Sequence, residues 1–381
     1  MHINLYILYL VICVGQDPAP GPVAIKNVRI LTVAGAEIAS GTIVLKDGKI
    51  EALGADVAAP AGARVIDGAG RVVMPGLVHP YTRIGGSRGG TGNAPNHLAL
   101  EELIPSLDGY RPVIRAGFTT LALYPAGGPL SGQAVAFKPR GVARDQMSFL
   151  SPAYLRIDVD ANTQSKEQLR LALDGAKRWK DRRGGGEAKP DDRTAPLVQF
   201  LKGELRALVD IQSPGEYLHF RQVLKPFEDS ALKFAIVGSS DLWRAAEALG
   251  ARKETVLLRP DPWRPDPRDP VVPDTRIRVN PASELAAAGC TVGLMPSDDF
   301  AGLEAHLFRA AQIVKAGLSR DLALRAITIV PAEAAGVGKR VGSLEKGKDA
   351  DLLLLDGDPF CGTARILMVF IDGRVELEVT P

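Results

Sequence analysis

Apolar and polar positions follow one pattern near both ends of the chain and another in its middle. Residues 42–45 form an apolar run that leads to Asp47 and Gly48. An Asp-Gly pair between two apolar strands predicts a β-hairpin, because both turn positions favour positive φ angles. The same pattern recurs near the C-terminus at Asp372 and Gly373. We therefore expect two strand-rich ends that pair into one small sheet domain.

The middle of the chain alternates between helical and extended patterns. Short apolar runs predict strands, and apolar positions that recur every three to four residues predict helices. The predicted strands cover residues 118–123, 206–211, 233–237, 255–258 and 291–295. The predicted helices cover residues 100–116, 166–182, 216–227, 241–249, 282–288, 303–316 and 321–335. Such alternation is typical of βα units built around a parallel sheet, so the predicted class is α/β.

Length and charge exclude some classes of partner. The chain has 381 residues, and its 46 Lys or Arg residues nearly balance 44 Asp or Glu residues. This balance does not indicate binding to nucleic acid or to a charged membrane surface. Inside the body of the chain no apolar run reaches the length of a membrane-spanning helix, so no such span is expected in the mature protein.

The N-terminus begins with an apolar segment. Residues 3–14 are apolar except for Asn4, and a Pro-rich linker follows over residues 15–22. The pattern favours a signal peptide and export to the periplasm or the exterior, although no Lys or Arg precedes the apolar segment. The alternatives are a buried first strand or a misassigned start, and with a misassigned start the protein would be cytoplasmic.

One stretch, residues 75–85, organises the interpretation of the middle. It reads Pro-Gly-Leu-Val-His-Pro-Tyr-Thr-Arg-Ile-Gly and follows an apolar run. The Pro-Gly pair interrupts the apolar pattern, which predicts a buried strand that opens into a loop. The stretch resembles the metal-binding signature of the amidohydrolase superfamily, in which Pro-Gly-Leu precedes Asp-x-His-x-His. In this chain His79 occupies the motif's aspartate position, and Tyr81 and Arg83 occupy its two histidine positions.

Other segments resemble the imidazolonepropionase-like branch of the same superfamily. They cover residues 47–50, 65–70, 116–120, 328–334 and 342–352. The resemblance implies a (β/α)8 TIM-like barrel and a small composite β-sandwich domain built from both chain ends. The implied boundaries are a leader and linker over 1–21, the β-sandwich over 22–74 and 340–381, and the barrel over 75–339. The family hydrolyses non-peptide C–N bonds, but a shared scaffold does not identify a reaction.

The family's metal ligands are only partly present in this chain. The resemblance places Asp210 at the histidine of the fifth strand, Val237 at that of the sixth, and Asp298 at the aspartate of the eighth. A divalent metal needs imidazole or carboxylate ligands that converge on one ion. We therefore expect no metal cofactor, and zinc or another divalent metal only if this mapping is wrong. The five histidines of the chain are interpreted as structural residues.

A cation can take the place of the metal. Loss of the metal would leave Asp298 buried and unpaired, which is costly. We predict that the Arg83 guanidinium replaces the metal and bridges Asp298, with Asp210 as a second contact, while Tyr81 donates a hydrogen bond.

Three functions remain open. The first is a protein that has lost hydrolysis and binds a small molecule at the old mouth. The second is a metal-free or weakly metal-dependent hydrolase that uses Asp298 as its base and Arg83 or Tyr81 to hold the oxyanion. The third is a non-catalytic subunit, in a homo-oligomer or with an intact paralogue. The residues expected at the mouth are Asp210, Gln212, Asp299 and Lys138.

Two features allow more than one interpretation. Lys138 and Lys202 can each be a carbamate ligand or, as we expect, a solvated surface lysine, and Lys138 can also line the mouth. Residues 261–275 are rich in Pro and Asp and can form either a lid or a plain surface loop.

Overall fold

The computed structural model describes residues 21–379, apart from 88–89, 91, 160–162, 182–188 and 262–279. Almost all of the predicted leader and nearly all of the segment 261–275 therefore lie outside the described residues. Within the described part, none of the helices has the length and apolar character that crossing a membrane requires.

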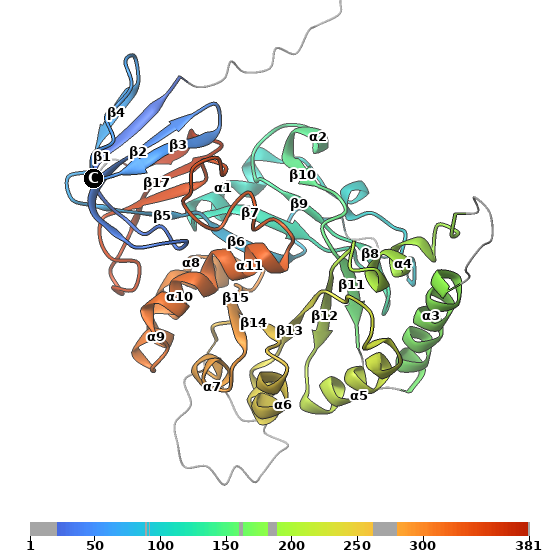
Figure 1. Ribbon diagram of the computed structural model, residues 1–381. Helices are drawn as coiled ribbons and strands as arrows, with labels where there is room; N and C mark the ends of the chain where they lie inside the picture. The colour runs from blue at the N-terminus through green and yellow to red at the C-terminus, as the bar shows by residue number, and fades with distance from the viewer. Residues whose placement is uncertain are drawn as a thin grey trace, which may run out of the picture.

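Strands from both ends of the chain form one eight-stranded sheet (Figure 1). Its order is β18-β17-β16-β5-β1-β2-β3, and β4 pairs with β1. The strands are β1 (Val23–Ile30), β2 (Ile38–Lys46), β3 (Lys49–Gly54), β4 (Arg64–Asp67), β5 (Val72–Pro75), β16 (Leu352–Leu355), β17 (Ile366–Ile371) and β18 (Arg374–Glu378). Since β16 pairs with β5, the two ends of the chain are joined inside this terminal sheet.

Both predicted hairpins are confirmed. Asp47 and Gly48 connect β2 to β3, and Asp372 and Gly373 connect β17 to β18. All four residues have positive φ angles, between 50° and 75°. A two-residue turn with this geometry matches the twist of the flanking strands, which explains why Asp-Gly occurs at both places.

Two further sheets occupy the middle of the chain, in the orders β10-β9-β7-β6 and β15-β14-β13-β12-β11-β8. Their strands are β6 (Leu77–Thr82), β7 (Phe118–Leu123), β8 (Gly132–Gln133), β9 (Val135–Phe137), β10 (Ser148–Leu150), β11 (Leu155–Asp158), β12 (Ala207–Ile211), β13 (Phe234–Gly238), β14 (Thr255–Leu258) and β15 (Thr291–Leu294). Strands β11 to β15 are parallel, each paired with the next along the chain, and β6 is parallel to β7. The carboxyl ends of β11 to β15 therefore lie at one edge of their sheet.

Helices connect these strands and cover the sheets, so the fold is mixed α/β as predicted (Figure 1). They are η1 (Ala99–Glu101), α1 (Leu107–Arg115), α2 (Arg144–Met147), α3 (Thr163–Asp181), α4 (Ala195–Leu201), α5 (Pro214–Leu224), η2 (Lys225–Phe227), η3 (Ser240–Ala245), α6 (Ala246–Ala251), α7 (Ala282–Ala287), α8 (Phe300–Glu304), α9 (His306–Lys315), α10 (Arg320–Ile327) and α11 (Ile329–Ala334). The helix predicted over 100–116 begins only at Leu107, because Ser106 caps α1 by accepting a hydrogen bond from the Gly109 amide.

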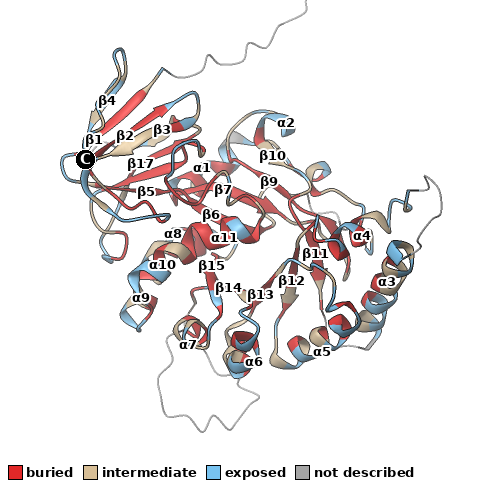
Figure 2. Ribbon diagram, in the orientation of Figure 1, coloured by how far each residue is buried: buried red, intermediate tan, exposed pale blue. Residues whose placement is uncertain are grey.

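Buried residues are concentrated on the strands and on the helix faces that touch them (Figure 2). One core cluster runs through the middle sheets and their helices. A second cluster lies within the terminal sheet and combines residues from both ends of the chain, including Ile25, Val73, Leu352 and Phe370.

Candidate functional site

Polar side chains from three strands and from the segment after a fourth gather at one edge of the fold. Tyr81 lies in β6, Arg156 in β11 and Asp210 in β12, and Asp298 follows β15 by four residues. Ligands of α/β proteins generally bind at the carboxyl ends of parallel strands. Tyr81, Asp210 and Asp298 lie at or just beyond such ends, and Arg156 contacts Tyr81 from earlier in its strand. This group forms the candidate site.

Tyr81 occupies the centre of the site. Its hydroxyl donates a hydrogen bond to Asp210 Oδ2 at 3.0 Å and accepts one from Arg156 Nε at 2.8 Å. The side chain is buried, and burial together with the nearby Asp210 carboxylate raises the pKa of the phenol well above its ordinary value. Tyr81 therefore stays protonated, and it donates to Asp210 and not into a bridge between Arg83 and Asp298.

Arg156 is the central cation, and the sequence interpretation did not identify it. It is buried, and besides Tyr81 it donates to Asp158 Oδ2 at 2.8 Å and to Ser131 Oγ at 3.1 Å. Burial opposes its positive charge, but the Tyr81 hydroxyl and Asp158 outweigh burial, and the pKa of Arg156 is raised. The alternation of apolar and charged residues in Leu155–Asp158, which reads Leu-Arg-Ile-Asp, is the signal that could have pointed to it.

Asp298 is held by the end of β6. Its Oδ1 accepts hydrogen bonds from Thr82 Oγ1 at 2.6 Å and makes a 2.9 Å contact with His79 Nε2, and its Oδ2 accepts from the Arg83 amide at 2.7 Å. Burial favours the neutral acid, but His79 and the other donors outweigh it, and the pKa of Asp298 is lowered. Asp298 is therefore a carboxylate at neutral pH, with 37% of its side chain exposed.

The prediction that the Arg83 guanidinium bridges Asp298 is wrong. The guanidinium forms an ion pair with Glu102 at 2.7 Å and donates to the carbonyl oxygens of Tyr124 and Ser87. Only the backbone amide of Arg83 reaches Asp298. The side chain turns away because the buried carboxylate of Glu102 offers it a direct partner.

Tyr124 was also missed by the sequence interpretation. Its ring stacks on that of Tyr81, with ring centroids 4.0 Å apart. The guanidinium groups of Arg156 and Arg83 lie 5.1 Å and 5.7 Å from the Tyr124 centroid, within the range of cation–π attraction. Burial and the charge of Asp298 raise the pKa of Tyr124, so its hydroxyl is a donor too.

The remaining predicted site residues are divided between the site and other places. Gln212 donates to Asp210, and its backbone amide donates to Glu216 at the start of α5. Asp299 is next to Asp298 in sequence, but its carboxylate caps α8 through the Gly302 amide at 2.8 Å. Val237 is buried in β13, where its apolar side chain has no ligand atom to offer.

Lys138 is neither a mouth residue nor a solvated lysine, so both alternatives are corrected. It is 3% exposed and contacts Asp349 at 2.8 Å, Asp351 at 3.0 Å and also Asp372. All three carboxylates come from the C-terminal segment, so Lys138 joins the middle of the chain to the terminal sheet. Lys202 is exposed, as expected of a surface lysine.

Taken together, the fold and the position of the site define an α/β protein whose parallel strands end at a polar site and whose two chain ends share one sheet. Residues 301–375 match the family model described as Amidohydrolase family. The chain also shares its fold with the amidohydrolase from Thermotoga maritima MSB8, at a TM-score of 0.79 and 19% identity, over 94% of this chain and 100% of that one. These findings confirm the resemblance to the amidohydrolase superfamily.

Two further comparisons agree with this resemblance. A 5-methylthioadenosine/S-adenosylhomocysteine deaminase from Acetivibrio thermocellus is 25% identical over 387 aligned positions, covering 88% of this chain and 86% of that protein. The solved structure of an adenosine deaminase from Xanthomonas campestris with bound zinc has a TM-score of 0.50 at 15% identity, and the match covers 95% of this chain and 94% of that one.

Proposed function

We propose that this chain is an amidohydrolase-fold protein that has lost the divalent-metal site and metal-dependent hydrolysis, and that it binds a small molecule at the carboxyl ends of its parallel strands. The observation that carries the proposal is the hydrogen-bonded group of Arg156, Tyr81 and Asp210. Each polar atom in this group has a protein partner, so the site is satisfied without an added cation.

The residues do not fit a divalent metal. Tyr81 stands where the family has a histidine, and its raised pKa keeps the phenol protonated, which makes it a poor ligand. The guanidinium of Arg156 is a permanent cation that would repel a second one in the same place. Among the described residues, no group of three or more His, Cys, Asp or Glu side chains is arranged to hold a metal ion.

A residual hydrolase is the second candidate, and one observation favours it. Asp298 is partly exposed and contacts a histidine, which is how a carboxylate base is often oriented. Against this, its hydrogen bonds and lowered pKa make the carboxylate a weak base. We therefore place ligand binding ahead of catalysis by Asp298.

The proposal extends to the architecture. The two middle sheets would close into the (β/α)8 barrel over 75–339, with β6 as the first strand and β15 as the last. The hydrogen bonds from Thr82 and the Arg83 amide to Asp298, which follows β15, support this closure. The domain boundaries, export through the N-terminal segment and assembly as a homo-oligomer or with a paralogue remain part of the same proposal.

Metal stoichiometry tests the proposal. The full chain is expressed with zinc, manganese or iron supplied, purified without chelator and measured by elemental analysis. We expect a ratio well below one metal per chain, because a protonated Tyr81 stands at a ligand position and the Arg156 guanidinium beside it carries a permanent positive charge. The zinc-containing Xanthomonas campestris deaminase, purified in parallel, is the positive control.

Other outcomes would replace the proposal. A ratio near one or two would show that the site holds metal, and turnover of amides or lactams would then be expected. Hydrolysis by metal-poor protein that is lost in Asp298→Asn would favour the second candidate. Co-purification of a paralogous amidohydrolase would favour a subunit role.

A further inference from the structure

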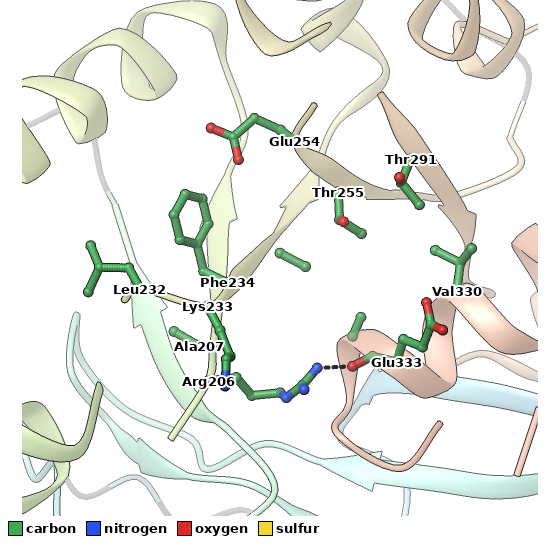
Figure 3. Close-up of a pocket in the computed structure, with 12 residues that line it drawn as sticks. Arg206, Ala207, Leu232, Lys233, Phe234, Glu254, Thr255, Thr291, Val330 and Glu333 are labelled. Carbon is green, nitrogen blue, oxygen red and sulfur yellow. Dashed lines mark hydrogen bonds between the residues drawn. The ribbon is translucent and has the colours of Figure 1, made fainter. Parts of the chain in front are cut away.

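A cavity of about 310 Å³ lies at the opposite end of the parallel strands from the candidate site (Figure 3). Its walls come from the first residues of β12 to β15 and from α11. Pockets that hold small molecules typically begin at about this size. Its polar lining residues are Arg206, Lys233, Thr255, Thr291, Glu254 and Glu333.

Arg206 supplies a positive charge to this cavity without a carboxylate partner among the described residues. Its guanidinium donates to the backbone oxygen of Glu333, toward which it extends in Figure 3. A half-buried guanidinium normally pairs with an anion, because desolvation of a charge is costly. Burial lowers the pKa of Arg206, and the nearby Glu333 carboxylate opposes that shift without forming an ion pair.

Lys233 places a second cation on the same cavity. Its ammonium donates to the Gly203 oxygen at 2.9 Å, and it too has no carboxylate partner within the described part of the chain. Thr255 and Thr291 are paired neighbours in β14 and β15, so both side chains belong to the wall formed by these strands. The cavity therefore combines two cations and two hydroxyl groups with the carboxylates of Glu254 and Glu333.

The other lining residues set the shape of the ligand. Phe234 and Val330 contribute apolar surface on opposite sides of the cavity (Figure 3). The Glu254 carboxylate also lines the cavity, but it already interacts with Arg221 at 3.5 Å and with the Tyr217 hydroxyl at 3.3 Å. The negative charge of Glu254 is thus partly neutralised by Arg221.

We propose that this cavity is a binding site for a small organic carboxylate with an apolar body. The carboxylate would pair with the fork of Arg206 and with Lys233, since a guanidinium matches the two oxygens of a carboxylate. The apolar body would lie between Phe234 and Val330. This site shares no residue with the group around Tyr81, so it does not depend on the function proposed above.

Calorimetric titration of the full chain with benzoate tests the proposal, with benzamide as the neutral probe of similar shape. We expect saturable benzoate binding that weakens as the salt concentration rises. Arg206→Gln should weaken it roughly 10- to 100-fold, the effect of removing a charged hydrogen-bonding partner. Arg206→Lys keeps the charge but not the fork of the guanidinium. Its benzoate affinity should therefore lie between those of the wild-type chain and Arg206→Gln.

Two control variants assign the effect to this cavity. Arg111→Gln removes an arginine whose side chain is 79% exposed, and it should leave benzoate affinity unchanged. Tyr81→Phe alters the candidate site alone, so this variant should also bind benzoate with unchanged affinity. Benzoate binding weaker than about 1 mM, equal binding of benzamide, or full affinity in folded Arg206→Gln or Arg206→Lys would each overturn the proposal.

Discussion

At the scale of single residues, His306 is a buried imidazole in an apolar setting. It is fully buried at the start of α9, and its ring lies 5.4 Å from that of Phe118. Neither ring nitrogen has a hydrogen-bond partner among the described residues. Burial, with smaller contributions from His79 and Arg309, lowers the pKa of His306 to about 3.

Stability should therefore depend on pH through His306. The unfolded chain binds a proton at this residue below about pH 6.5, whereas the folded chain does not until about pH 3. The free energy of unfolding should then fall as the pH drops through this window. In His306→Phe the decline should be smaller, as measured by urea unfolding between pH 7 and pH 4.

A matched variant keeps this test specific. His219→Gln removes another histidine, in α5, and we expect it to retain the slope of the wild-type chain. Equal slopes for wild type and His306→Phe would show that His306 does not contribute to the acid sensitivity.

Sequence could identify the position of the site but not which cation would occupy it. The resemblance places Tyr81 and Asp210 at family ligand positions, and in the structure the two side chains share a hydrogen bond. Arg83 stands at the position of a lost ligand, yet its side chain pairs with Glu102, which is close only in the folded chain. Arg156 reaches the site from another strand, and only the alternating charges of that strand mark it in the sequence.

At the scale of elements, Lys138 connects the segment after β9 to the loop before β16 and to the turn between β17 and β18. Its ammonium is surrounded by the carboxylates of Asp349, Asp351 and Asp372. Burial raises the pKa of Asp351, whereas for Asp349 the nearby cations outweigh burial and lower the pKa to about 2. The lysine therefore compensates carboxylates that would otherwise be buried and unpaired.

Lys138→Met should destabilise the protein by about 3–5 kcal/mol, because the variant leaves buried carboxylates without their shared cation. Denaturant unfolding at pH 7 measures the change. Lys202→Met, at an exposed position, should change stability by less than about 0.5 kcal/mol. An equally small change in stability for Lys138→Met would show that the contacts of Lys138 with the three carboxylates do not hold the middle of the chain to the terminal sheet.

Elements with strong local signals were predicted, and elements fixed by tertiary contacts were not. The Asp-Gly hairpins and the strands β12 to β15 lie within a residue or two of their predicted positions. Strands β8, β9 and β10 have only two or three residues each, so their periodicity is too short to detect. They exist because neighbouring strands pair with them.

At the scale of the whole molecule, both chain ends are needed for one sheet. Strand β16 lies between β17 and β5, so the C-terminal strands complete a sheet begun by the N-terminal ones. The buried cluster of this sheet also draws on both ends.

Truncation tests this dependence. Deletion of residues 340–381 removes β16, β17 and β18 and leaves an edge of β5 unpaired, so we expect loss of cooperative thermal unfolding and aggregation. A chain that ends at Val379 keeps all three strands and should unfold like the full chain. A soluble, cooperatively folding 1–339 fragment would contradict this expectation.

The peptide nitrogen of Arg83 joins the end of β6 to Asp298, beyond the end of β15. A backbone donor is present in every amino acid except proline. The side chain at position 83 can therefore change during evolution without loosening this contact. Comparing residue identities among relatives would not detect the contact, and only Arg83→Pro would necessarily remove its donor.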